Sequence, residues 1–154
     1  MNAEPVIITI ADAMHKAGIE GVLIGNAAAA LQGAPVTTMD FDFLVRMTGA
    51  NLKKIQTAAE YLSAEVLVLK ESAVIRLVND KDGVIVDFID ENYPPGINSF
   101  ASLRSRADKL ELGNSCIYVA DLKDIIKSKE ALRRPKDMAV IELLKDTLYE
   151  KEKK

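Results

Sequence analysis

Two aspartates separated by one residue are the clearest indication of chemistry in this sequence. Asp40 and Asp42 stand in the segment MDFDFLVR, residues 39–46. Because side chains alternate along a strand, both carboxylates are expected on one face, opposite Phe41 and Phe43. Two carboxylates this close repel each other and raise each other's pKa unless a cation lies between them. Carboxylate oxygens suit a hard divalent ion, so the pair predicts a site for Mg²⁺ or Mn²⁺.

A third aspartate extends this prediction. Asp87 interrupts the apolar run VIVDFID, residues 84–90, where a lone carboxylate is costly to bury without a partner or a metal ion. Asp87 either joins Asp40 and Asp42 in a metal site or forms a salt bridge with a neighbour such as Arg76 on the adjoining strand. A solvated strand face is the corresponding alternative for Asp40 and Asp42. The apolar residues around all three favour the metal site.

The turn Gly25-Asn26 has the character of a phosphate site. It follows an apolar strand over 22–24 and precedes a helix predicted over 26–31, with Asn26 as its N-cap. Backbone N–H groups at the start of a helix attract anions, and glycine lets a phosphate approach the chain closely. Turns of this kind are also common where nothing binds. The prediction therefore depends on the order of the chain, in which the paired aspartates and then Asp87 follow.

Two charged residues in the C-terminal part stand where the helical pattern calls for apolar ones. The apolar stripe that begins at Leu122 predicts an apolar residue at position 129, but the sequence has Lys129. Asp137 heads the apolar stripe of the last predicted helix. A lysine extending off an apolar face and an aspartate favouring the helix dipole are the structural alternatives. An exposed basic turn accounts for most of the positive side chains between them, which are Arg133, Arg134 and Lys136.

The hydrophobic pattern predicts an α/β fold in which a small mixed sheet, flanked by helices, positions these residues. Helices are expected over 5–17, 26–31, 48–63, 99–109, 121–132 and 135–148. Strands are expected over 22–24, 39–46, 65–69, 73–78 and 84–90, with a loop over 92–98 and a hairpin over 110–119. We expect one domain over 1–154, with a core over about 5–119 and two closing helices over about 120–150.

The order of these features resembles that of a known family. The segment VLIGNAAAALQGAPVTTMDFDFLV resembles the core of the minimal nucleotidyltransferases of the DNA polymerase β-like superfamily. Their motif is an apolar strand, Gly-Gly or Gly-Ser, a short helix and Asp-x-Asp, with a third acid on a later strand that Asp87 matches. The tail DLKDIIKSKEALRRPKDMAVIELL is similar to the end of the bacterial branch that includes AbiEii-type toxin nucleotidyltransferases. The resemblance covers about 20–45, 84–90 and 119–145, and Asn26 stands where the family usually has Gly or Ser.

This resemblance implies a metal-dependent enzyme that moves an NMP from an NTP such as ATP to a hydroxyl acceptor, which is RNA, a protein or a small molecule. It implies that one or two Mg²⁺ or Mn²⁺ ions are held by Asp40, Asp42 and Asp87. It also implies that Asp87 helps to deprotonate the acceptor. The nucleotide phosphates would be bound by Gly25, Asn26 and Lys129, with Asp137 orienting the triphosphate or another group of the site.

Other functions remain open beside this one. A nucleotidyltransferase-fold module that binds nucleotide or a partner protein without turnover is the main alternative, which Asn26 favours. A Mg²⁺-dependent nuclease or phosphatase could use the same acids, but the glycine turn and Lys129 suit a triphosphate better. The similarity to the AbiEii-type branch further suggests a toxin–antitoxin context with a small partner protein.

Length and composition limit the class of protein. The 154 residues are 49% hydrophobic and 28% charged, which excludes a disordered or low-complexity chain. The single cysteine, Cys116, excludes an intrachain disulfide, and no apolar run reaches the length of a membrane span. A cytoplasmic protein without membrane contact is therefore expected. The net charge of −3 argues against nonspecific nucleic-acid binding, although residues 121–154 carry 10 basic and 8 acidic side chains, a net of +2.

Overall fold

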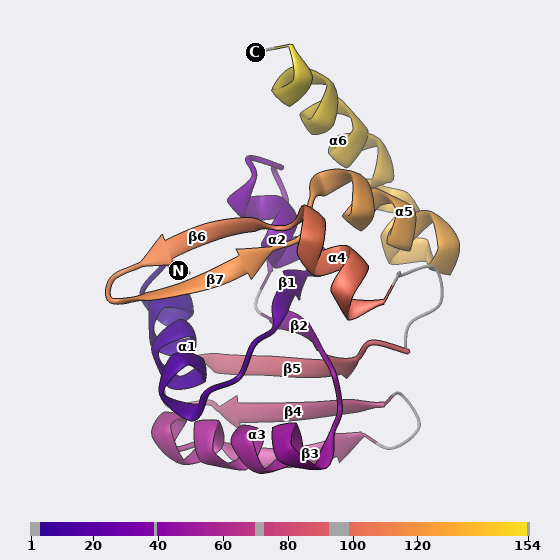
Figure 1. The fold of residues 1–154 in the computed structure, drawn as a ribbon. Helices are drawn as coiled ribbons and strands as arrows, with labels where there is room; N and C mark the ends of the chain where they lie inside the picture. The colour runs from indigo at the N-terminus through magenta and orange to yellow at the C-terminus, as the bar shows by residue number, and fades with distance from the viewer. Residues whose placement is uncertain (1–3, 39, 70–72, 93–98, 154) are drawn as a thin grey trace.

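One mixed sheet carries the candidate site. The computed structural model describes residues 4–38, 40–69, 73–92 and 99–153, and these residues form seven strands in the order β3-β4-β5-β2-β1-β7-β6 (Figure 1). The strands are β1 (Val22–Ile24), β2 (Phe41–Val45), β3 (Glu65–Leu69), β4 (Val74–Asn79), β5 (Val84–Asp90), β6 (Asp108–Leu112) and β7 (Ser115–Val119). The helices are α1 (Glu4–Ala17), α2 (Gly25–Leu31), α3 (Gly49–Leu62), α4 (Phe100–Arg106), α5 (Leu122–Leu132) and α6 (Pro135–Glu152).

The centre of the sheet combines both pairing directions. Strand β2 pairs in parallel with β5 and antiparallel with β1, which itself pairs in parallel with β7. The outer strands β3, β4 and β6 pair antiparallel with their neighbours. The predicted α/β fold with a mixed sheet is thus confirmed. At the centre, β2 pairs with β5 so that residues 45 positions apart in the sequence become neighbours, and this is where the predicted aspartates lie.

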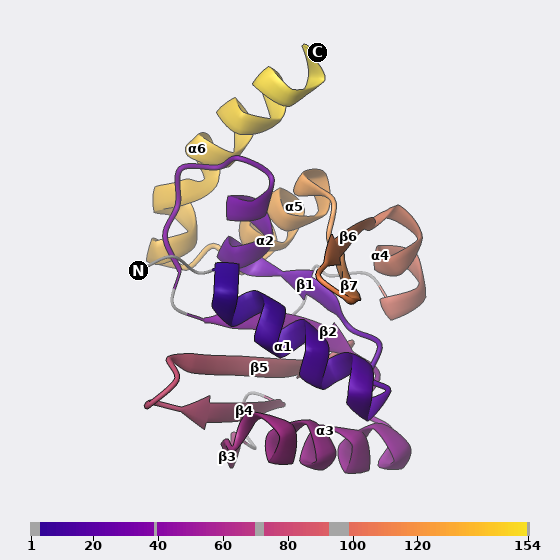
Figure 2. The same ribbon diagram turned by 90° about the vertical axis from the view of Figure 1, so that its left-hand side faces the viewer.

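One face of the sheet is covered by α1, which crosses in front of the strands in Figure 2, and by α3, which packs against α1 and β3. The rings of Phe43 in β2 and Phe88 in β5 stack on each other on this face, with centroids 6.1 Å apart. Both side chains are fully buried, as the alternation in residues 39–46 predicts. Since successive residues of a strand point to opposite faces, Asp42 and Asp87 face away from this core.

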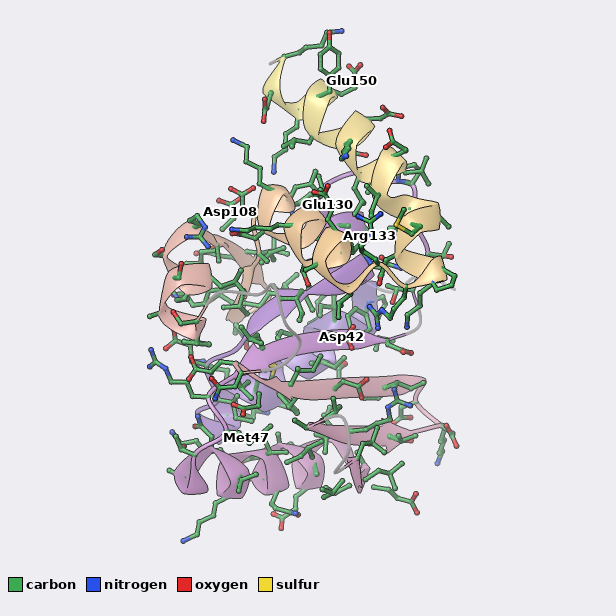
Figure 3. The ribbon with its side chains drawn as sticks, turned by 90° about the vertical axis from the view of Figure 1, so that its right-hand side faces the viewer. Asp42, Met47, Asp108, Glu130, Arg133 and Glu150 are labelled. Atoms are coloured by element: carbon green, nitrogen blue, oxygen red, sulfur yellow. The ribbon has the colours of Figure 1, made fainter. Side chains whose placement is uncertain are left out.

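The other face carries α4 and α5, and α6 packs on α5 (Figures 1 and 3). Local side-chain caps set where these helices begin. The Asp121 carboxylate accepts a hydrogen bond from the backbone N–H of Lys123 at the start of α5, and Ser99 caps α4 in the same way. Pro135 occupies the first turn of α6, where its missing N–H has no partner to lose. The basic turn between α5 and α6 lies on the same side of the sheet as Asp42 and Asp87.

The predicted helices and strands agree with the observed bounds, except at the ends of a few helices. The helix predicted over 99–109 ends at Arg106, because the chain then enters β6. The last helix continues to Glu152, one turn beyond the predicted end near Leu148. Met39 in the predicted strand 39–46 and most of the predicted loop over 92–98 lie outside the described residues. Among the helices that the structure describes, none has the length and apolar character needed to cross a bilayer.

Candidate active site

A row of charged side chains crosses three adjacent strands on the face of the sheet opposite α1. Asp42 in β2 is the register partner of Asp87 in β5, and Asp87 is the register partner of Arg76 in β4. Directly paired residues of neighbouring strands have their side chains on the same face, about 5 Å apart. Parallel pairing of β2 with β5 therefore brings together two carboxylates that are 45 positions apart in the sequence.

A single cavity of about 260 Å³ collects the predicted acids. Asp40, Asp42 and Asp87 all line it, as does Gly25 at the end of β1. Asp40 lies just before β2, where the hydroxyl of Thr38 donates to its backbone carbonyl and accepts from its backbone N–H. Figure 3 labels Asp42 between the sheet and the α5–α6 helices, which form the opposite wall. The structure thus places the three predicted aspartates around one space.

The charge on Asp42 is poorly compensated within this cavity. Burial, together with the nearby charges of Asp87 and Asp40, raises the pKa of the Asp42 carboxyl to about 6. Arg76 and Lys136 act in the opposite direction but do not offset these effects. A carboxylate that is disfavoured in this way gains from a bound cation. The oxygen donors of Asp40 and Asp42 therefore fit a hard divalent ion.

Asp87 is paired differently from the other two acids. Its Oδ1 accepts a hydrogen bond from Nε of Arg76 at 2.7 Å, and its Oδ2 accepts one from Nη2 at 2.9 Å. This salt bridge to Arg76 is the alternative that the sequence left open for Asp87. No three acidic, histidine or cysteine side chains converge on a common point within the described part of the chain. Both oxygens of Asp87 are thus paired with Arg76, and a metal site formed by all three carboxylates stays a prediction.

Gly25 lies in close contact with Asp42. Its φ of +70° is in the left-handed region, and a Cβ built on it would come 3.0 Å from Oδ2 of Asp42. Both observations favour glycine at this position, because a side chain there would be strained and would press on the carboxylate. The backbone at the end of β1 therefore forms part of the cavity wall next to Asp42.

The prediction for Asn26 as a helix cap is wrong. The helix α2 begins one residue earlier, at Gly25, so that Ile24 occupies the N-cap position without a side-chain hydrogen bond. Asn26 lies within the first turn, and its Oδ1 is buried without a hydrogen-bond partner among the described residues. Its side chain does not line the cavity. The positive φ of Gly25 lets the chain turn directly from β1 into the helix, which leaves no capping role for Asn26.

Lys129 projects from α5 into the opposite wall of the cavity. It is only 8% exposed, and its Nζ lies 3.5 Å from Oδ1 of Asp137 at the start of α6. Burial lowers the pKa of the Lys129 ammonium, while the charge of Asp137 counteracts this effect. The two residues that interrupt the apolar stripes are thus partners, which explains how each charge is tolerated inside.

Asp137 itself is fully buried and does not line the cavity. Its carboxylate accepts hydrogen bonds from the backbone N–H and the guanidinium of Arg134, at 3.1 Å and 2.6 Å to Oδ2. Burial opposes ionisation of Asp137, but the hydrogen bonds from Arg134 and the charge of Lys129 together keep its pKa below the usual value. In this position Asp137 contacts Lys129 and Arg134 and fixes where they lie.

The basic turn contributes more to the cavity than the sequence indicates. Arg134 and Lys136 both line it, whereas the sequence pattern assigned them mainly to an exposed turn. Arg76 was recognised in the sequence only as a candidate partner of Asp87, although it also lines the cavity. The signal that could have identified the basic residues is their position directly after the helix that carries Lys129. One wall of the cavity is therefore acidic and the other basic.

Solved structures of nucleotidyltransferase-type proteins share this fold. An antigenic nucleotidyltransferase-like protein from Paracoccidioides brasiliensis aligns with a TM-score of 0.63 and 16% identity over 92% of this chain and 74% of its own. For the antibiotic-resistance factor ANT(2'')-Ia, the TM-score is 0.62 and the identity is 13%, and the alignment covers 94% of this chain and 85% of that protein. For a candidate nucleotidyltransferase from Thermotoga maritima, the TM-score is 0.55 and the identity is 18%, and the alignment covers 95% of this chain and 92% of that protein.

These similarities concern the fold. Neither a protein-family model nor a curated protein sequence matches this chain. The resemblance to nucleotidyltransferases that the sequence suggests is confirmed at the level of the fold. The similarity to the AbiEii-type branch is not tested by these comparisons and stays a prediction.

Proposed function

We propose that this chain transfers a nucleotidyl group from an NTP to a hydroxyl acceptor, with Mg²⁺ or Mn²⁺ bound at the site. The observation that carries the proposal is the division of one cavity into an acidic and a basic wall. Asp40 and Asp42 lie on the sheet, and Lys129 and Lys136 lie across from them. A nucleoside triphosphate with its divalent cation presents complementary charges, because its phosphates need cationic groups and its metal ion needs oxygen ligands. The nucleotidyltransferase fold of the chain supports the same function.

The acidic wall would hold the cation. Asp40 and Asp42 supply its carboxylate ligands, and the raised pKa of Asp42 indicates that such an ion relieves an existing repulsion. When bound, the ion would stabilise negative charge on the phosphate oxygens. Gly25 has no side chain, so the backbone at the end of β1 can lie directly against Asp42 in the cavity wall.

The basic wall would bind the phosphates. Lys129 is held in place by Asp137, so little conformational freedom is lost when it contacts an anion. Lys136 and Arg134 add positive potential near the same space. The acceptor oxygen would form a bond to the α-phosphorus while the bond to the pyrophosphate oxygen breaks, and positive groups here would stabilise the charge that develops on the leaving group.

Two roles are open to Asp87 in the proposed function. The sequence predicts that it serves as a metal ligand and helps to deprotonate the acceptor, and its position beside Asp42 is compatible with both. Its pairing with Arg76 favours the alternative function, in which the chain binds nucleotide or a partner protein without turnover. The toxin–antitoxin context, with a small partner protein, also stays within the proposal, as does the choice among RNA, protein and small-molecule acceptors.

The test is transfer of label from α-³²P-labelled NTPs in the presence of Mg²⁺ or Mn²⁺. Each of the four nucleotides is incubated with the full chain and, separately, with cellular RNA, with cellular protein and with a panel of small hydroxyl compounds. We expect label to be transferred by the wild type and lost in Asp42→Ala. Asp12→Ala, in an exposed ion pair with Lys16, serves as the matched control and should retain transfer. Nucleotide binding without transfer to any acceptor would support the binding module instead, and undiminished transfer by Asp42→Ala would exclude the assigned site.

A further inference from the structure

The pairing of Arg76 with Asp87 is built into the sheet. The two residues are register partners in the antiparallel pair β4–β5, so the backbone ladder holds them opposite each other. Both carboxylate oxygens accept hydrogen bonds from one guanidinium, at 2.7 Å and 2.9 Å. This two-point geometry is the strongest arrangement for an arginine–carboxylate pair. It leaves neither oxygen of Asp87 without a donor.

The surroundings of the pair strengthen it. Asp87 is 7% exposed, and a buried carboxylate depends on its partner far more than a solvated one does. The guanidinium stays positively charged at every physiological pH, and its hydrogen bond to Asp87 raises its pKa further. Arg76 therefore neutralises Asp87 permanently, within the chain itself.

The other two acids differ in this respect. No salt bridge is formed by Asp40 or Asp42 to any residue that the structure describes. Their positions on one strand face, two residues apart, leave an excess of negative charge on this side of the cavity. Of the three aspartates, Asp40 and Asp42 therefore carry the negative charge that a bound cation would neutralise.

We propose that Arg76 takes the place of a second divalent cation, so that the site holds one Mg²⁺ or Mn²⁺ ion on Asp40 and Asp42 while Asp87 stays outside the ligand set. This inference rests on the cation-binding part of the proposed function. A guanidinium and a divalent ion perform the same electrostatic task at Asp87, and the charge of Arg76 repels a second cation from the lone pairs that its two hydrogen bonds leave free. Arg76 is therefore a positioning residue that determines how many ions the site accepts. It lines the cavity, so it also adds positive charge beside the space in which anionic oxygens would lie.

The number of bound ions tests the proposal directly. Mn²⁺ alone is titrated into the full chain at pH 7.5, and bound ion is measured by isothermal calorimetry and by the electron paramagnetic resonance signal of free Mn²⁺. We expect one Mn²⁺ per chain in the wild type and none in Asp42→Asn. In Arg76→Gln, which frees Asp87, we expect a second Mn²⁺ to bind or the affinity to rise at least tenfold. Arg76→Lys keeps the positive charge and should retain a single ion.

A matched control is Arg104→Gln. Arg104 also forms an arginine–carboxylate pair, with Glu20 at 2.8 Å, but outside the cavity, and its loss should leave the stoichiometry at one. Thermal unfolding of each variant shows whether it is folded. If Arg76→Gln does not fold, the wild-type stoichiometry still decides the question. Two Mn²⁺ ions or none in the wild type would overturn the inference, as would unchanged binding by a folded Arg76→Gln variant.

The two proposals fail in distinguishable ways. A wild type that binds one Mn²⁺ but transfers no nucleotide contradicts the proposed function and leaves this inference standing. A wild type that transfers nucleotide and binds two Mn²⁺ ions contradicts this inference alone.

Discussion

Gly25 and Asp42 are in such close contact that a Cβ on the glycine would come 3.0 Å from Oδ2 of the carboxylate. The contact joins the turn between β1 and α2 to the acidic wall of the cavity, and Ile24 and Asp42 are register partners in the antiparallel pair β1–β2. The position of the carboxylate and the shape of the turn are therefore interdependent. A change at either residue is expected to affect the other.

The first prediction concerns Gly25→Ala. The positive φ should cost about 1–2 kcal/mol of folding stability, and the added Cβ should push the Asp42 carboxylate and weaken Mn²⁺ binding. Gly33→Ala is the matched control, because Gly33 also has a positive φ but open space around its Cβ position. Urea unfolding should show a similar loss of stability in both variants, whereas Mn²⁺ titration should show weaker binding only in Gly25→Ala. Equal Mn²⁺ affinity in the two variants would contradict the role of the contact.

The second prediction concerns the charge on Asp42. Its folded-state pKa of about 6 lies above the ordinary value of 3.8, so the carboxyl group favours the folded state below about pH 4 and loses this contribution as the pH rises through 6. Without divalent ions at pH 7.5, Asp42→Asn should therefore be more stable than the wild type, by about 3 kcal/mol at 1.36 kcal/mol per pKa unit. The gain should shrink as the pH falls from 7.5 to 5.

Urea unfolding in EDTA over this pH range measures the effect. Asp12→Asn serves as the control, since Asp12 is half-exposed in an ion pair with Lys16 and its loss should change stability little. Added Mn²⁺ should stabilise the wild type and leave Asp42→Asn unchanged, because only the intact carboxylate pair binds the ion. A wild type as stable as Asp42→Asn at pH 7.5 in EDTA would show that the charge of Asp42 is already compensated.

The third prediction separates binding from stability at Lys129. Burial lowers the pKa of its ammonium, and Asp137 keeps the hydrogen bonds from Arg134 when the lysine is replaced. Lys129→Met preserves the length of the side chain, so it should fold with nearly unchanged stability but bind NTP at least tenfold more weakly. Lys127→Met, at an exposed position of the same helix, should bind as the wild type does. Calorimetric titration with a non-hydrolysable NTP provides the measurement, and equal affinity in both variants would remove Lys129 from the binding site.

The fourth prediction assigns a structural role to Asp137. Replacing it with alanine leaves Lys129 buried without its partner and removes the acceptor for Arg134, which should cost about 3–5 kcal/mol. Asp146→Ala, at an exposed position of the same helix, should cost less than about 0.5 kcal/mol. Because the pKa of Asp137 is lowered in the folded state, its contribution is present above about pH 4 and is lost at more acidic pH. Unfolding of both variants in urea at pH 7 and at about pH 2.5 tests this, and the two variants should differ less at the lower pH.

Much of the site follows from local sequence patterns. The alternation around Asp42 predicts which side chains enter the core, and Phe43 and Phe88 are buried accordingly. The stripes single out Lys129 and Asp137 as charged residues at apolar helix positions, and the structure shows both buried. These predictions succeed because the 2.0 and 3.6 residue periods relate neighbouring positions to one face of a strand or helix.

The predictions that failed required information beyond neighbouring residues. The capping preference of asparagine amounts to only about 1 kcal/mol, and the conformation of Gly25 at the end of β1 starts the helix one residue before Asn26. Arg134 and Lys136 are exposed, as the sequence predicts, but the sequence did not indicate that both also line the cavity. Their position over the sheet depends on how α5 and α6 pack, which the local pattern does not contain.

Asp87 shows most clearly what each level decides. The amino-acid sequence alone determines that a carboxylate lies in an apolar strand and requires a partner, because burying an isolated charge is too costly. It leaves open whether that partner is a metal ion or Arg76. Only the tertiary structure decides this, because the partner depends on the register of β4 and β5 and on which strand lies next to β2. Register sets which side chains meet across a sheet, and it arises from contacts between segments that are distant in the chain.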